Sequence, residues 1–330
     1  MSVVLTRDQI ESILSLYHLD APEAFGGSDR VPAAYWVRVQ GRKYVLRMSQ
    51  RRSIDDMMFE KELLAMSARA DLAVPRLLQN VAKGTFTPWA RRGRFVSLFT
   101  HPEGRQLGRF EIRPDGAGAV GAWLGAFHRQ TRAFHRFKRP EASPPGVLLD
   151  RLERALERRR LARRHAETVR RLRAWERSAP LSTVLPKGPT HLALTLSNVL
   201  FRDGRLTGVV GFERAATDAF VVDVAGAIHE WCWLPDPEPG DGPRGHFEAA
   251  RVRAFLTQYE AQRRLTVAEW RALPHALTFT AVREAARRLA DHELRGSRAA
   301  RPYRDHRHHL ARLEALSELS LDAARAPAPS

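Results

Sequence analysis

A chain of 330 residues is too long for one small hydrophobic core and suits two lobes or domains. It contains no apolar run near the ~20 residues that would span a bilayer, and its first residues do not read as a signal peptide. The only cysteine, Cys232, excludes an internal disulfide framework, fits a reducing cytoplasm and, between two tryptophans, is expected to be buried. The net charge of +17 gives a surface that attracts nucleic acid, anionic lipid or acidic proteins without selecting one of them.

The first part of the chain predicts a helix followed by a β-hairpin. Thr6 and Gln9 have the spacing of a capping box, which opens a helix through about Tyr17. Residues 35–39 and 43–48 are rich in β-branched and aromatic side chains, and a short turn containing glycine separates them. Two such runs predict an antiparallel hairpin.

A helix over residues 59–70 and a strand over residues 94–99 follow, by the spacing of their apolar side chains. The proline and glycine near residues 101–106 punctuate the chain, so we place a lobe boundary there. Residues 1–101 would then form an N-terminal, β-rich nucleotide lobe.

Helices dominate the predicted second lobe, residues 102–322, before a disordered tail at 323–330. Residues 117–131 predict a helix, and residues 148–177 a long helical stretch with eleven arginines and four glutamates. That stretch is either a solvated amphipathic face or a basic nucleic-acid-binding module. Residues 198–212 predict a second hairpin, because their Asp-Gly pair suits a tight type I′ turn.

Residues 190–201 resemble the catalytic segment of the homoserine kinase and aminoglycoside phosphotransferase superfamily. That segment reads His-Gly-Asp-Leu and then Asn-Val-Leu-Phe, where this chain has His-Leu-Ala-Leu and Asn-Val-Leu-Phe. Matches continue in order at residues 210–212, 218–225, 228–233 and 259–266. The resemblance implies an α+β, bilobal, protein-kinase-like fold, with ATP and Mg²⁺ as the cofactors of an active member and homoserine as its substrate.

The resemblance also shows which carboxylates are missing, and so marks a degenerate member. Ala193 occupies the position of the catalytic aspartate and Gly211 that of the metal-binding aspartate, while Asn198 is kept on the metal side. Phosphoryl transfer in such enzymes depends on a carboxylate for the attacking hydroxyl and on a second carboxylate for Mg²⁺. Glu213 and Asp218 are the possible replacement ligands.

Three further positions complete the vestigial site that the resemblance implies. Arg47 stands where the family places a lysine or arginine that contacts phosphate, with Glu60 or Glu62 as its partner. The alternative interpretation is that Arg47 is a surface arginine on a strand. His191 is expected to be a packed scaffold residue of the catalytic loop. The family's polar front loop is replaced here by residues 31–35, Val-Pro-Ala-Ala-Tyr, which lack those polar side chains.

Three functions remain open from the sequence. The first is a pseudokinase that binds an unknown small molecule or protein, with no cofactor expected. The second is a working ATP-dependent phosphotransferase that uses Glu213 or Asp218. The third is a basic module for nucleic acid or an acidic partner.

Overall fold

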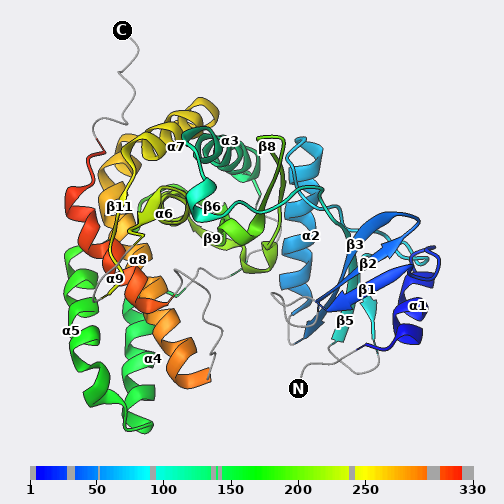
Figure 1. The fold of residues 1–330 in the computed structure, drawn as a ribbon, viewed down its shortest axis with the longest axis horizontal. Helices are drawn as coiled ribbons and strands as arrows, with labels where there is room; N and C mark the ends of the chain where they lie inside the picture. Colours follow the sequence, from blue (N-terminus) through cyan, green and yellow to red (C-terminus); the bar gives the residue numbers. More distant parts are fainter. Residues whose placement is uncertain are drawn as a thin grey trace.

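The computed structural model describes residues 5–27, 34–50, 53–89, 94–134, 139, 143–237, 242–295 and 305–321. A small antiparallel sheet with two helices stands at one end of the molecule, and a larger, mostly helical part at the other (Figure 1). Every strand pair described is antiparallel, so the α+β, kinase-like arrangement expected from the sequence is confirmed and a central parallel sheet is absent from the described strands.

The five-stranded sheet has the order β1-β2-β3-β5-β4. Its strands are β1 (Ala24–Gly27), β2 (Ala34–Val39), β3 (Arg42–Gln50), β4 (Thr87–Pro88) and β5 (Arg94–Thr100). Gln40 and Gly41 both have positive φ in the two-residue turn between β2 and β3, which fits the right-handed twist of a hairpin. One face of the sheet packs on helix α1 (Arg7–Ser15), which begins at the predicted Thr6–Gln9 capping box.

Helix α2 (Ile54–Arg69) starts five residues before the predicted Phe59. Ser53 caps it by accepting the backbone N–H of Asp56, whose side chain accepts in return the N–H of Ser53. This reciprocal cap supplies a start signal that apolar spacing does not reveal.

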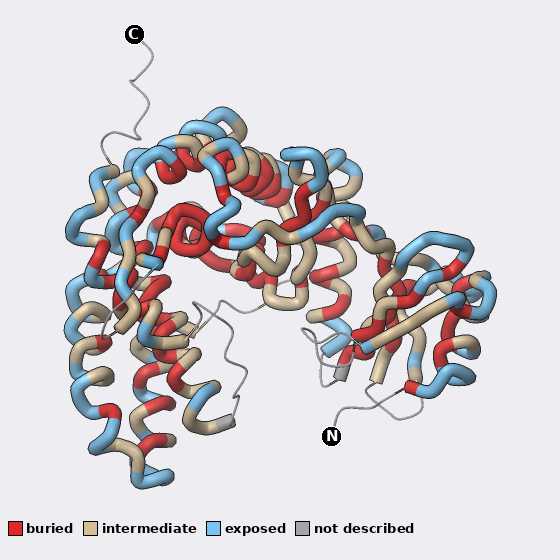
Figure 2. Tube along the Cα trace, viewed as in Figure 1, coloured by how far each residue is buried: buried red, intermediate tan, exposed pale blue. Residues whose placement is uncertain are grey.

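The helical part is built around α6 (Phe220–Trp231), whose described side chains are almost all buried (Figure 2). Around it lie α3 (Pro114–Thr131), α7 (Ala249–Gln262), α8 (Val267–Arg295) and α9 (His306–Ala315). Helices α3 and α7 approach closely at two glycines: a Cβ on Gly121 would lie 2.2 Å from the Phe255 carbonyl oxygen, and one on Gly125 would lie 2.5 Å from that of Tyr259. A larger residue at either position would therefore separate the two helices.

Three two-stranded antiparallel sheets complete the described strands of this part. They are β6 (Lys187–Thr190) with β9 (Ala216–Ala219), β7 (Val199–Arg202) with β8 (Arg205–Val209), and β10 (Trp233–Pro235) with β11 (Gly245–Phe247). The predicted type I′ turn between β7 and β8 is present, with φ of 51° at Asp203 and 75° at Gly204. Strand β9 ends at Ala219, and helix α6 begins at the next residue, Phe220.

The predicted long helical stretch over residues 148–177 is wrong as one helix. It is two helices, α4 (Pro145–Arg158) and α5 (Ala162–Ser178), which reverse direction at a turn where Arg160 has φ of +59°. Arg173 of α5 pairs with Glu153 and Asp150 of α4, and leucines from both helices pack on α8.

Cys232 is fully buried, as expected from its tryptophan neighbours, and burial raises the pKa of its thiol. Among the described residues, no helix is long and apolar enough to cross a membrane. The lobe boundary near 101–106 remains a prediction, and the tail at 323–330 lies outside the described residues.

Candidate active-site cleft

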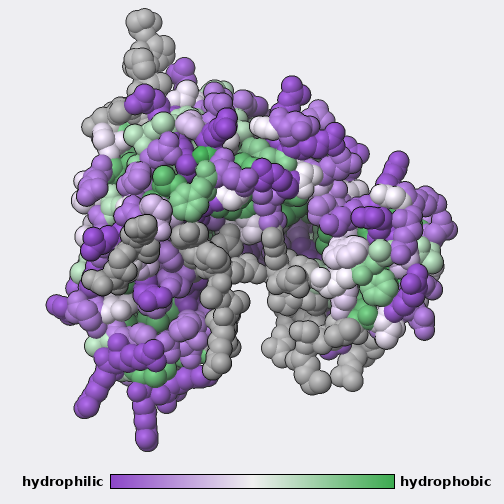
Figure 3. Space-filling view, in the orientation of Figure 1, coloured by the Kyte–Doolittle hydropathy of each residue, from purple (hydrophilic) through white to green (hydrophobic). Residues whose placement is uncertain are grey.

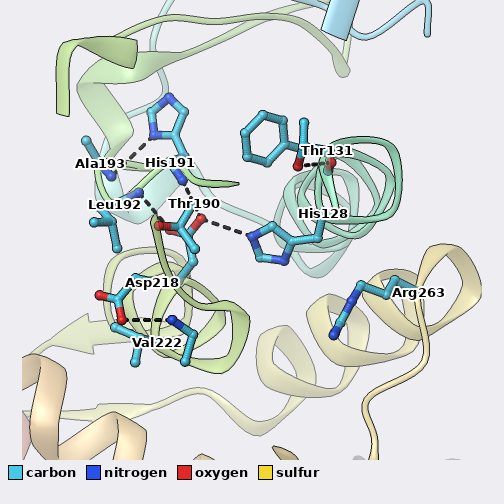
Figure 4. Close-up of polar contacts among 12 residues, drawn as sticks. His128, Thr131, Thr190, His191, Leu192, Ala193, Asp218, Val222 and Arg263 are labelled. Atoms are coloured by element: carbon cyan, nitrogen blue, oxygen red, sulfur yellow. Dashed lines mark hydrogen bonds and ion pairs between the residues drawn. The ribbon is translucent and has the colours of Figure 1, made fainter. Parts of the chain in front are cut away.

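The loop after β6 is anchored by one carboxylate. Asp223, near the start of α6, accepts the backbone N–H of His191 at 2.6 Å and that of Leu192 at 2.8 Å. His128 points from α3 toward the same carboxylate, with Nε2 at 3.1 Å (Figure 4). These bonds hold Leu192 at φ of +53°, a left-handed conformation that costs about 1–2 kcal/mol for a residue with a side chain.

Burial and hydrogen bonding set the charges in this anchor. Burial works to raise the pKa of the Asp223 carboxyl, but His128 and the loop N–H groups outweigh it and hold that pKa below its ordinary value. Burial lowers the pKa of His191 to about 4 and lowers that of His128 as well. The loop therefore rests on a buried carboxylate and two neutral imidazoles near neutral pH.

Helix α6 holds the loop at two further points. The indole N–H of Trp231 donates to the Leu194 carbonyl at 2.8 Å, and Glu230 accepts the N–H of Leu196 at 3.2 Å. His191 is buried, and its Nδ1 accepts the N–H of Ala193 at 3.2 Å. These hydrogen bonds hold the 191–196 loop in place, although the loop carries Ala193 and not an acid at its centre.

The two positions that lack carboxylates face each other across Asn198. The Asn198 amide N–H donates to the Ala193 carbonyl at 2.9 Å. Gly211 has φ of +93°, and a Cβ on it would lie 2.4 Å from Asn198 Nδ2. The asparagine side chain thus fills the space in which a side chain at residue 211 would have to stand.

Arg47 and two glutamates form a row along the same cleft. Arg47 Nη2 of β3 lies 2.8 Å from Glu60 Oε1 of α2, and Nη1 lies 3.6 Å from Glu213 Oε2. Its guanidinium also covers the ring of Phe99, 4.6 Å from the centroid. Glu60, not Glu62, is therefore the α2 partner of this strand arginine, a pairing similar to the lysine–glutamate pair of protein kinases.

A cleft of about 680 Å³ joins these residues. The strands of the sheet line one side, and the 193–198 loop with residues 210–214 lines the other. The described lining includes two carboxylates, Glu60 and Glu213, against five cations. Those cations are Lys43, Arg47, Arg105, Arg214 and Arg288.

A match over most of the chain identifies the protein family. A family model described as "Phosphotransferase enzyme family" matches residues 25–265. The homoserine kinase of Gluconacetobacter diazotrophicus is 30% identical over 295 residues, which is 86% of this chain and 85% of that relative. The chain belongs to this phosphotransferase family, on its homoserine kinase branch.

Other relatives and solved structures agree with the family. The homoserine kinase of Granulibacter bethesdensis is 28% identical over 309 residues, 87% of each chain. An amicoumacin kinase has a TM-score of 0.66 at 18% identity, covering 94% of this chain and 91% of its own. An aminoglycoside phosphotransferase from Alicyclobacillus acidocaldarius has a TM-score of 0.61 at 16% identity, covering 96% and 95%. At these identities the two structures establish the fold alone.

The phosphotransferase family is defined by ATP and Mg²⁺ chemistry, and the residues present here do not fit its metal site. Mg²⁺ requires several oxygen ligands around it. The Asn198 side chain lies beside Gly211 and donates its amide N–H to the Ala193 carbonyl, while the Glu213 carboxylate, two residues further along the chain, faces Arg47. In the described part of the chain, no group of three or more His, Cys, Asp or Glu side chains is placed to hold a metal.

Asp218 lies apart from the residues that line the cleft. Its carboxylate pairs with Arg283 of α8 at 3.1 Å and accepts the N–H of Ala219, and both acidic and basic partners are buried. Of the two replacement ligands expected from the sequence, Glu213 lines the cleft and Asp218 does not. Residues 31–33 of the front loop lie outside the described residues, and Ala34 opens β2 and lines the cleft.

Sequence reasoning missed Arg139, which ties the two parts of this chain together. Its guanidinium donates to the carbonyls of Glu213 and Ala215 at 2.8 and 2.7 Å and pairs with Asp56 of α2 at 2.9 Å. No local sequence pattern indicates the contacts of Arg139, because its partners are 74 or more residues away along the chain. His128 was missed for the same reason.

Proposed function

We propose that this member of the homoserine kinase branch is a pseudokinase that binds an anionic, phosphate-bearing small molecule in its cleft without Mg²⁺ and without transferring phosphate. One observation carries the proposal. The Asn198 amide bonds to the Ala193 carbonyl and fills the space beside Gly211, so both positions lack an acid and the one at residue 211 is also closed to a side chain.

The loss of two carboxylates is large enough to end useful turnover. Removing a general base typically costs 10²–10⁴ in rate, and removing the metal's stabilisation of the transferring phosphate costs several kcal/mol more. Ala193 and Gly211 supply neither group. Glu213 is the one acid of the lining near this point, and its carboxylate faces Arg47.

The cleft nevertheless keeps what an anion needs. Its lining carries five cations and two carboxylates, although Arg105 also pairs with Glu111, and Arg214 with Glu284, outside the lining. Guanidinium groups bind phosphate oxygens through paired N–H donors. Arg47 is 13% exposed and fixed by Glu60, so it is presented to the cleft at little further cost in side-chain entropy. We infer that a nucleoside di- or triphosphate is the class of ligand.

A protein of this fold holds a nucleotide after one of its aspartates has been replaced by alanine. One solved structure with a TM-score of 0.51 and 13% identity, covering 94% of this chain and 98% of its own, is an aspartate-to-alanine mutant of an aminoglycoside phosphotransferase in a ternary complex with ADP and hygromycin B. For this chain, binding without turnover is the function that its side chains favour.

The test is calorimetric titration of ADP and ATP, each with Mg²⁺ and with excess EDTA. We expect equal affinity in both conditions, and loss of binding in Arg47→Ala. Arg38→Ala is the matched control, because Arg38 is an exposed arginine on β2 and its removal changes the net charge equally. Affinity that rises tenfold or more with Mg²⁺ would show that a metal site assembles and would contradict the proposal.

A coupled assay for phosphorylation of homoserine and related amino alcohols completes the test. We expect no ATP-dependent product. Turnover at the rate of a metabolic kinase would instead support the alternative of a working phosphotransferase, with Glu213 as the first residue to replace by glutamine.

A further inference from the structure

The end of the α4–α5 hairpin is a concentrated cationic surface outside the cleft. The base of the hairpin is fixed on α8 by buried leucines, whereas its tip projects away from the body, on the side far from the sheet (Figure 1). Long hydrophilic side chains extend from that end (Figure 3). Seven exposed arginines lie on residues 151–164, against two glutamates. We call residues 158–164, Arg-Arg-Arg-Leu-Ala-Arg-Arg, the arginine tip.

No described acidic side chain lies within ion-pair distance of the arginines of this tip. Among the described residues, none of the five forms an ion pair, while arginines farther along α5 do: Arg170 pairs with Glu167, and Arg173 with Glu153 and Asp150. Stability alone does not account for the tip. Five guanidinium groups in seven residues repel one another, and Arg160 sits at φ of +59°, where glycine or asparagine is favoured.

We propose that the arginine tip binds the phosphate backbone of double-stranded nucleic acid, independently of sequence. Guanidinium groups bind phosphate oxygens through paired N–H donors, and the exposed tip can present several of them to one backbone. This inference does not depend on the function proposed for the cleft, because none of the tip residues lines the cleft.

Two features of the tip favour a duplex over other polyanions. The large apolar side chains that are exposed in the described residues lie elsewhere, and the nearest along the chain, Val147, is at the opposite end of α4. A membrane surface would therefore gain no apolar anchor from the tip. The tip also lacks aromatic rings: the aromatic residue of α5, Trp175, lies at the far end of that helix under Arg171. Unpaired bases would find no stacking platform there.

The test uses the full chain and a fluorescent 20-base-pair duplex of mixed sequence, followed by anisotropy at ~50 to ~200 mM salt. Five phosphate contacts give a slope of about −4.5 for log K against log salt, so affinity should fall about 500-fold over this fourfold range. Changing Arg158, Arg159, Arg160, Arg163 and Arg164 to glutamine should reduce affinity at ~50 mM at least ~100-fold and flatten the slope. The same five changed to lysine should keep most of the slope.

The matched control changes five exposed arginines spread over other elements to glutamine. They are Arg69, Arg205, Arg253, Arg264 and Arg271. This control alters the net charge equally and should weaken binding less than about fivefold. Equal loss in both glutamine variants, or no duplex binding at ~50 mM, would overturn the proposal, as would tip-dependent binding to phosphatidylserine vesicles without binding to the duplex. Circular dichroism confirms that each variant is folded.

Discussion

Substituting Gly211 by alanine tests whether the metal-aspartate position is closed by its surroundings. The added Cβ would stand 2.4 Å from Asn198 Nδ2 in a backbone with φ of +93°. The left-handed conformation costs about 1–2 kcal/mol for a residue with a Cβ. Moving the Asn198 amide breaks its bond to the Ala193 carbonyl, worth about 1 kcal/mol. We therefore expect Gly211→Ala to lower the free energy of unfolding by about 2–3 kcal/mol.

A second glycine separates the two contributions. Gly204 also has positive φ, 75°, but a Cβ there would meet nothing within 4 Å, so Gly204→Ala should cost only the conformational part, about 1–2 kcal/mol. In an Asn198→Ala background, Gly211→Ala should fall to that same cost, which gives a coupling of about 1 kcal/mol between the two positions. Urea unfolding followed by tryptophan fluorescence measures all four variants.

Two results would refute this reasoning. One is a Gly211→Ala cost within ~0.5 kcal/mol of the Gly204→Ala cost, because independent sites add within about that error. The other is an unchanged Gly211→Ala cost when Asn198 is replaced. If the reasoning holds, restoring both acids with Ala193→Asp and Gly211→Asp should recover Mg²⁺-dependent nucleotide affinity only in part, because the new carboxylate enters a filled space.

Two further predictions concern buried ionisable residues: His191 and Asp223 of the loop anchor, and His229 of α6, whose Nε2 lies 2.8 Å from the Leu277 carbonyl. Burial holds the pKa of His191 at about 4 and that of His229 at about 3, below the ordinary 6.5, so the unfolded chain binds protons first as pH falls. The free energy of unfolding should therefore decrease from pH ~6.5 to pH ~4, by about 3 kcal/mol through His191 alone. In urea unfolding, His191→Gln should lack this contribution of His191 to the pH dependence. Equal slopes of the free energy of unfolding against pH in the two proteins would contradict the prediction. Asp223→Ala should cost about 3–5 kcal/mol, because it leaves buried N–H donors unpaired, whereas exposed Asp115→Ala should cost less than about 1 kcal/mol; similar losses would show that Asp223 is not the anchor.

Local chemistry explains which elements the sequence could predict. The Thr6–Gln9 cap and the Asp203–Gly204 turn depend on neighbours within four residues, so short spacing was enough. The break between α4 and α5 carries no glycine or proline and was missed, because Arg160 adopts its left-handed φ where the chain reverses. The spacing of apolar residues continues across such a turn and therefore predicts a single helix.

The sequence could likewise locate some residues of the candidate site but not the contacts between them. Ala193 and Gly211 could be located from the ordered motifs around them, and so could Asn198. The direction of the Asn198 amide could not, since it depends on how residues 193 and 211 come together in space. Contacts such as that of His128 with Asp223, 95 residues apart, need the packed arrangement of α3 and α6.

The bridge made by Arg139 has a consequence for the thermodynamics of ligand entry. Its contacts with α2 and with the carbonyls beyond Gly211, together with the Arg47 pair to Glu213, fasten the two walls of the cleft to each other before any ligand arrives. Ligand binding then has little domain closure to drive, because the conformational entropy of the two cleft walls is already lost when the protein folds. Ligand association should proceed as a single fast phase, without the slow step that accompanies closure of a mobile lid.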